Sequence, residues 1–183
     1  MLRDEHWFEG LYDRHQPAVG AYCVRRAGSV DGADAAAQVF SVAWRRRDDV
    51  PAGNRELPWL YGVARRVLGH HWRSVGRARR LAEKAGVLPI DAPPTPEVVA
   101  AANAERELVR AALAGLRPGD QEVLMLTAWE GLTHAEVAEA LDCSPAAVDK
   151  RVSRAKSRLA DAFQKLERTQ SPPVSAPRGG GAA

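Results

Sequence analysis

Apolar residues recur at helical spacing along most of the chain, and no alternation of apolar and polar residues lasts long enough to predict a β-strand. The first helical stretch places Leu11 and Val19 on one side, and Pro17 is expected to bend or divide it. Asp31 suits the N-cap of a second helix, which carries Phe40 on its apolar side. The pattern therefore predicts an all-α protein.

A third helix is expected after an irregular segment. Residues 48–57 include proline, glycine and asparagine, which favour a loop, and Pro58 suits the first turn of the helix that follows. The predicted buried stripe of this helix consists of Leu60, Val63, Ala64, Val67, Leu68 and His71. Trp44 and Trp129 are expected in the core because of their large apolar surface.

The chain changes character over residues 81–95, where three prolines between 89 and 94 cannot continue a helix and predict a flexible linker. Helical spacing resumes at residue 96 and includes a short helix over 118–128. Residues 169–183 are rich in proline, glycine, serine and alanine, so a disordered tail is expected. We therefore predict two small helical domains, 1–80 and 96–168.

The sharpest local pattern runs over residues 130–159. Thr133 and Glu136 form a capping box for one helix, and a short turn follows it. Ser144 then caps a second helix that begins at Pro145. Two short helices joined by a tight turn are typical of a helix-turn-helix, whose second helix lies in the major groove of DNA.

The second of these helices has an apolar back and a basic front. The positions expected to face bases or phosphates are Ala146, Ala147, Lys150, Arg151, Arg154 and Arg158. A helical hairpin with a solvated basic face is the alternative. We favour DNA binding, because the caps, the turn, the apolar stripe and the charge agree.

Charge is distributed unevenly, although the net charge is only +3. One basic cluster spans residues 65–84 and a second spans 150–158, whereas four acids lie within the first thirteen residues. Two separate basic clusters suggest two contacts with one polyanion. Charge alone leaves this interpretation about even with two solvated helix faces.

Several classes of protein are not expected. No apolar run approaches the roughly 20 residues needed to span a bilayer, and acids occupy the place of a signal peptide's apolar stretch, so we expect a cytoplasmic protein. Cys23 and Cys143 lie far apart and resemble small apolar residues more than a disulfide. Because the motifs of common catalytic and metal sites do not occur, neither an enzyme nor a metal or cofactor is expected.

Residues 116–159, LRPGDQEVLMLTAWEGLTHAEVAEALDCSPAAVDKRVSRAKSRL, resemble the C-terminal domain of the extracytoplasmic-function (ECF) sigma factors of bacterial RNA polymerase. The matching features are the proline-led helix, "EGL", and a basic last helix that ends in "RAKSRL". Residues 6–74 resemble the N-terminal domain of the same family through LYDRHQPAV, DAAAQVFSVAW and PWLYGVARRVLGHHWR. The resemblance covers about residues 6–166 in the expected order.

The resemblance implies a division of labour between three segments. The helix over 31–47 is similar to the segment that docks on the polymerase's clamp helices, and its candidate contacts are Asp34, Gln38, Ser41 and Arg45. The loop 48–57 and the helix 58–80 resemble the reader of the −10 element as melted DNA. Their candidate contacts are Asn54 for a base edge and Arg65, Arg66, Arg73 and Arg77 for phosphates. The helix-turn-helix resembles the reader of the −35 element as duplex.

The chain departs from the family pattern in places. Ala37-Gln38 stands where the family commonly has Gln-Glu, and Asp149 stands where lysine is usual, although an aspartate can accept from a cytosine amino group. The resemblance implies core RNA polymerase and promoter DNA as partners, with an anti-sigma factor as a further candidate. A stand-alone helix-turn-helix regulator and a protein-interaction adaptor remain the alternatives.

Overall fold

The computed structural model describes residues 3–84 and 102–170, and the side chains of residues 3–70 and 106–169. The described residues form helices and turns and contain no strand, which confirms the all-α prediction. Within these residues no helix is long and apolar enough to cross a membrane.

The chain forms two compact units, and the chain passes from one to the other more than once. The first unit contains residues 1–95 and 126–149, and the second contains residues 96–125 and 150–183. From residue 85 the predicted linker lies outside the described residues, and so does the predicted tail from residue 171. The predicted domain boundaries therefore stay a prediction.

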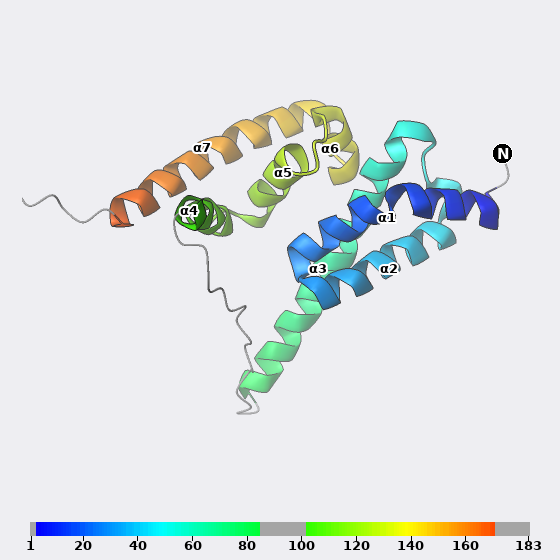
Figure 1. The fold of residues 1–183 in the computed structure, drawn as a ribbon, viewed down its shortest axis with the longest axis horizontal. Helices are drawn as coiled ribbons and strands as arrows, with labels where there is room; N and C mark the ends of the chain where they lie inside the picture. Colours follow the sequence, from blue (N-terminus) through cyan, green and yellow to red (C-terminus); the bar gives the residue numbers. More distant parts are fainter. Residues whose placement is uncertain (1–2, 85–101, 171–183) are drawn as a thin grey trace, which may run out of the picture. The chain divides into compact units, whose positions relative to one another are not determined.

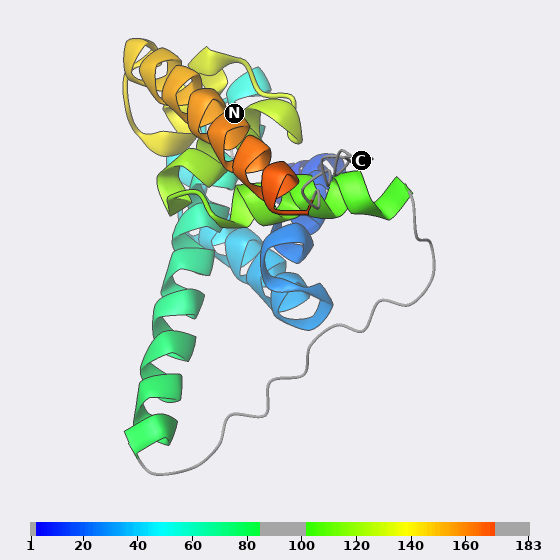
Figure 2. The same ribbon diagram turned by 90° about the vertical axis from the view of Figure 1, so that its left-hand side faces the viewer.

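Three long helices build the first unit (Figures 1 and 2). These are α1 (Glu5–Ala27), α2 (Ser29–Arg45) and α3 (Glu56–Lys84), with two 3-10 turns, Arg47–Asp49 and Gly53–Arg55, between α2 and α3. Each of the three helices packs against the other two, and α6 (His134–Leu141) packs on α3. The core residues of the three long helices include Leu11, Val19, Tyr22, Val39, Ala43, Leu60 and Leu68, all at most 1% exposed.

The second unit contains α4 (Ala102–Ala114), most of α5 (Pro118–Ala128) and most of α7 (Pro145–Gln170). Its buried apolar residues are Ala112, Leu116, Val123, Leu124, Val152 and Ala155. The short helix predicted over 118–128 is confirmed at both ends. The division between the units falls inside α5 and α7, which are each one continuous helix.

Some local predictions are wrong. α2 begins at Ser29 after Gly28, so Asp31 lies in the first turn and is not the N-cap. α1 is one helix that contains Pro17, so the proline does not divide it, and the expected bend stays a prediction. Trp129 is 57% exposed and Trp44 is 37% exposed, although Trp44 packs edge-on against Phe8 at 5.2 Å between ring centroids. Hydrophobicity alone does not bury a ring that lies at the rim of a small helical unit.

Candidate nucleic-acid interface

The predicted helix-turn-helix has the expected caps. The Thr133 hydroxyl accepts from the Glu136 backbone N–H at 3.3 Å, and the Glu136 carboxylate accepts from the Thr133 N–H at 2.8 Å. Asp142 ends α6 in the left-handed region at φ 53°. The Ser144 hydroxyl then accepts from the Ala147 N–H at 3.3 Å at the start of α7. The capping box and the second N-cap, both read from local sequence, are therefore confirmed.

α7 carries the predicted basic face. Val148 and Ala155 are fully buried on its apolar side. The predicted contacts Ala146, Lys150, Arg151, Arg154 and Arg158 are exposed, and Ala147 is half-buried. Arg158 donates to the Asp120 carboxylate, so a phosphate would have to replace this partner.

The predicted −10 reader consists of the turn before α3 and of α3 itself. Asn54 lies exposed in the 3-10 turn Gly53–Arg55, and Arg65 and Arg66 are exposed on α3. These polar side chains are thus all exposed on α3 or on the turn that leads into it. Arg73 and Arg77 also belong to α3, but their side chains lie outside the described residues.

A cavity of about 420 Å³ lies beside this turn, between α1 and the start of α3. Its lining consists of Arg3, His6, Trp7, Gly10, Arg14, Ala52, Gly53 and Glu56. The Arg3 guanidinium lies 5.1 Å from the centroid of the half-buried Trp7 ring. An aromatic face beside cations suits a stacked base of single-stranded DNA. Trp7 and Arg3 were not among the predicted contacts, because they lie some 50 residues before the loop that they adjoin.

A polar anchor fixes the start of α3. Glu56 is only 8% exposed, and its carboxylate accepts from Arg14 Nη2 at 3.1 Å and lies 2.8 Å from His15 Nε2. Because a buried carboxylate needs such partners, α1 holds the end of the loop in one place. The position of Asn54 is therefore tied to α1.

The predicted polymerase-docking residues share one face of α2. Asp34, Gln38, Ser41 and Arg45 are all exposed, while Val39 and Ala43 on the other side are fully buried. Spacings of three and four residues place the four side chains in one row along the helix. The four side chains are thus exposed on the side of α2 away from the core, and their role in docking stays a prediction.

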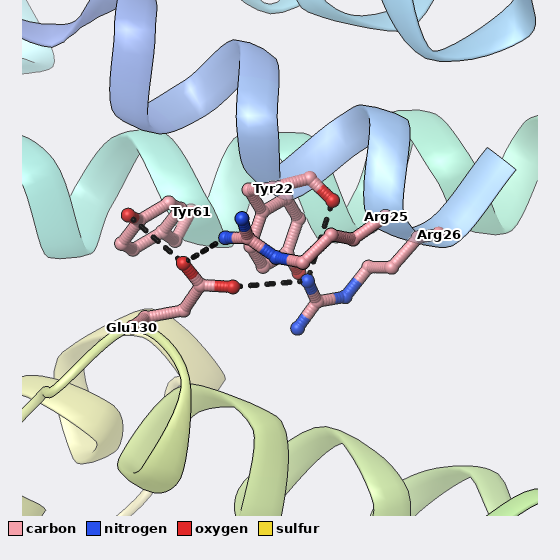
Figure 3. Close-up of polar contacts among 5 residues, drawn as sticks. All are labelled: Tyr22, Arg25, Arg26, Tyr61 and Glu130. Atoms are coloured by element: carbon pink, nitrogen blue, oxygen red, sulfur yellow. Dashed lines mark hydrogen bonds and ion pairs between the residues drawn. The ribbon is translucent and has the colours of Figure 1, made fainter. Parts of the chain in front are cut away.

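A buried ion-pair cluster, which the sequence did not predict, joins Glu130 to α1 and α3 (Figure 3). The Glu130 side chain is only 3% exposed, and it accepts from Arg25 at 2.5 Å and from Arg26 at 3.2 Å. Tyr61 of α3 donates to the same carboxylate at 3.4 Å. The Arg26 guanidinium lies 3.5 Å from the centroid of the Tyr22 ring, so it is stacked as well as paired.

The pKa values of two groups beside the cluster, Tyr61 and Cys23, are raised. Burial, followed by the charge of Glu130 and the hydrogen bond to it, raises the pKa of Tyr61 to about 12. Burial is also the main reason that the pKa of the Cys23 thiol rises to about 11, with Glu130 adding to it and Arg26 opposing it. Both groups are therefore neutral at physiological pH.

Comparison with known proteins gives a family match in the second half of the chain and sigma-factor relatives over most of its length. Residues 106–159 match the family described as sigma-70, region 4. RNA polymerase sigma factor CnrH of Cupriavidus metallidurans is 31% identical over 165 residues, covering 83% of this chain and 84% of the relative. RNA polymerase sigma factor NccH of Alcaligenes xylosoxydans xylosoxydans is 29% identical over 171 residues, covering 88% and 89%.

The fold also matches a solved structure. The sigma factor RpoE of Bartonella quintana, in a co-crystal structure with the anti-sigma factor NepR, superposes with a TM-score of 0.62. The match covers 89% of this chain and 98% of that one at 20% identity, so it shows a shared fold.

Proposed function

Because the chain belongs to the extracytoplasmic-function family of RNA polymerase sigma factors, we propose that it binds core RNA polymerase and directs initiation at a subset of promoters. It reads the −35 element as duplex through α6 and α7, and the −10 element as a melted strand through α3 and the preceding loop. The observation that carries the proposal is the helix-turn-helix with an exposed basic face, in a chain that matches sigma factors over most of its length. The protein performs no catalysis of its own and acts in the cytoplasm.

Polymerase docking is assigned to the exposed row on α2. An acid, an amide, a hydroxyl and a guanidinium at Asp34, Gln38, Ser41 and Arg45 offer charge and hydrogen-bond complementarity to a helical partner. The buried side of α2 fixes the row on a rigid support, which reduces the entropy lost on binding.

Recognition of the −10 element is assigned to the cavity beside Asn54. Melting requires a protein that binds unpaired DNA better than duplex, and a pocket for one extruded base provides this difference. Trp7 can stack on the base while Asn54 bonds to its edge. The exposed Arg65 and Arg66 support the strand through its phosphates, together with Arg73 and Arg77 further along α3.

Recognition of the −35 element is assigned to the start of α7. Ala146 and Ala147 leave room for base edges near the N-terminus of the helix, and Lys150 and Arg151 reach bases or the adjacent phosphates. Arg154 and Arg158 lie further along and add phosphate contacts.

The structure of a similarly folded sigma factor with an anti-sigma factor supports a partner of that class for this chain too.

The test is transcription from purified components. Adding the full chain to cognate core polymerase should give a stable complex and start transcripts at promoters that the core enzyme ignores. A protein that binds duplex operators tightly but forms no complex with core polymerase would contradict the proposal and favour a stand-alone regulator.

A further inference from the structure

Helix α6, the first helix of the helix-turn-helix, is seated on α3 inside the first compact unit. The two backbones approach so closely that a Cβ on Gly62 of α3 would lie 2.9 Å from the carbonyl oxygen of Ala140. Glu139 of α6 lies 3.9 Å from Arg55, the neighbour of Asn54. The first helix of the proposed −35 reader is therefore packed on the helix that carries the proposed −10 contacts.

This contact cannot persist while both promoter elements are read. Elements named −35 and −10 lie about 25 base pairs apart, which is roughly 85 Å of duplex at about 3.4 Å per pair. A helix in contact with Gly62 cannot at the same time present its partner α7 to a groove at that distance. If the proposed function is right, segment 126–149 must leave α1 and α3 when the promoter is bound.

The Glu130 cluster gives this contact its specificity without making it permanent. Glu130 and Arg26 are 3% and 4% exposed, so the attraction between them is opposed by the loss of their hydration. On separation the Glu130 carboxylate returns to water, which recovers its part of that hydration. Such a contact fixes one register of packing while remaining reversible, unlike an apolar interface of similar extent.

We propose that Glu130 is an internal latch that holds the first helix of the helix-turn-helix on α3 in the free protein. The latch closes through Arg25, Arg26 and Tyr61, and it opens when polymerase and promoter separate the two readers. Glu130 is thus a regulatory residue, and it contributes no contact to DNA. The proposal rests on the proposed function, since two-site reading is what requires the opening.

A distance measurement on the full chain tests the latch without DNA. Spin labels on Val30→Cys, in the exposed first turn of α2, and on Ala135→Cys, in exposed α6, report whether α6 is seated. Cys143→Ser leaves Cys23, which is fully buried, as the remaining native thiol. The free protein should give one short distance.

Two variants open the latch by different means. Glu130→Gln removes the carboxylate charge that pairs with the buried guanidinium of Arg26, and Gly62→Ala places a methyl group against the backbone of α6 while favouring the α3 helix itself. Each should add a longer distance and raise the ratio of open to closed protein by at least about tenfold. The controls are Glu107→Gln, whose ion pair with Arg110 is exposed, and Gly20→Ala, whose methyl meets only a flexible amide at 3.6 Å.

The outcomes separate the latch from the proposed function. An unchanged distance in Glu130→Gln with full helicity overturns the latch, and Arg25→Gln, at the more exposed partner, decides in the same way if Glu130→Gln loses helicity. Opening by Glu130→Gln in a protein that never binds core polymerase would keep the latch and remove the proposed function. Active transcription by a Glu130→Gln protein whose distance is unchanged would remove the latch and keep the proposed function.

Discussion

The Nδ1 atom of His134 lies 2.5 Å from Oδ1 of Asp149, a contact that joins the first turn of α6 to the early part of α7. Asp149 occupies the position where lysine is usual in the family, and the sequence suggested that its carboxylate could bond to a cytosine. In the structure this carboxylate already has a partner within the helix-turn-helix. The acid therefore braces the motif and leaves a negative charge beside the proposed DNA face.

Asp149→Lys should tighten binding to duplex promoter DNA and make it more sensitive to salt. One added phosphate contact steepens the plot of log binding constant against log salt by about 0.9. Asp149→Asn should tighten binding with little change in that slope, because it removes repulsion without adding a cation. Fluorescence anisotropy over a salt series measures both. Weaker binding by Asp149→Asn at unchanged thermal stability would show that the carboxylate contacts DNA favourably.

The basic residues of α7 should separate into DNA contacts and structural contacts. Arg154→Ala should weaken duplex binding and flatten its salt dependence by the equivalent of about one phosphate contact, since the guanidinium of this exposed residue donates only a neutral hydrogen bond, to the Lys150 carbonyl at 3.2 Å, among the described contacts. Arg158→Ala should weaken duplex binding less, because Arg158 pairs with Asp120. Arg110→Ala, on the exposed side of α4, serves as the control. Equal losses in Arg110→Ala and Arg154→Ala would contradict the assignment of the groove-facing side.

Trp7→Ala should weaken binding to a single-stranded −10 oligonucleotide by about 1–3 kcal/mol, the usual contribution of one stacked base. Affinity for core polymerase should stay unchanged, because Trp7 lines the cavity at the loop and not the exposed row on α2. The comparison needs two titrations of the same variant, with the oligonucleotide and with core enzyme. Asn54→Ala should instead change which −10 base is preferred. Loss of polymerase binding in either variant would move this loop out of the DNA path.

Local chemistry made much of this fold predictable. The capping box at Thr133, the N-cap at Ser144 and the apolar stripe of α3 depend on neighbours within one or two helical turns. The exposed rows on α2 and α7 follow from the same periodicity. Such features can be read from sequence because the residues that decide them are close together in the chain.

The long-range contacts could not be read in this way. Glu130 lies 105 residues from Arg25 and 69 from Tyr61, and no local pattern links an acid in a turn to arginines at the end of another helix. Trp129, the neighbour of Glu130, is exposed, although its large apolar surface suggested burial. The adjacent pair Arg25-Arg26 at the end of α1 could have suggested an ion pair with a distant acid. Arginines in the last turn of a helix that starts with an acid are equally typical of charges that interact favourably with the helix dipole.

Gly32→Ala should destabilise the first unit strongly. A Cβ at this position would lie 2.6 Å from the Cα of Val24, and backbone atoms of α1 cannot move aside as a flexible side chain can. Overpacking of this kind costs about 1–3 kcal/mol or more, although alanine itself favours the α2 helix. Chemical unfolding compared with Gly20→Ala measures the difference. A Gly32→Ala variant as stable as Gly20→Ala would show that α1 and α2 are not packed this closely in solution.

Stability should fall at alkaline pH because of Tyr61 and Cys23. The pKa of Tyr61 rises from 10.0 to about 12 and that of Cys23 from 9.0 to about 11, so folding favours the protonated form of each. The unfolded chain therefore releases these protons first as the pH rises. The stabilisation is complete below about pH 9, and it is lost over pH 9–11 for Cys23 and over pH 10–12 for Tyr61.

Urea unfolding between pH 8 and pH 11.5 should thus show a free energy of unfolding that declines by at most about 1.4 kcal/mol per pH unit for each group. Tyr61→Phe and Cys23→Ala should each flatten the decline over the range of the group that they remove, whatever they do to stability at pH 8. Glu130→Gln should lower the upper end of the pH range over which Tyr61 contributes to the decline, because both the negative charge and the hydrogen bond to it raise the pKa of this phenol in the folded protein. A decline that keeps its position in Glu130→Gln would mean that burial alone sets the pKa of Tyr61.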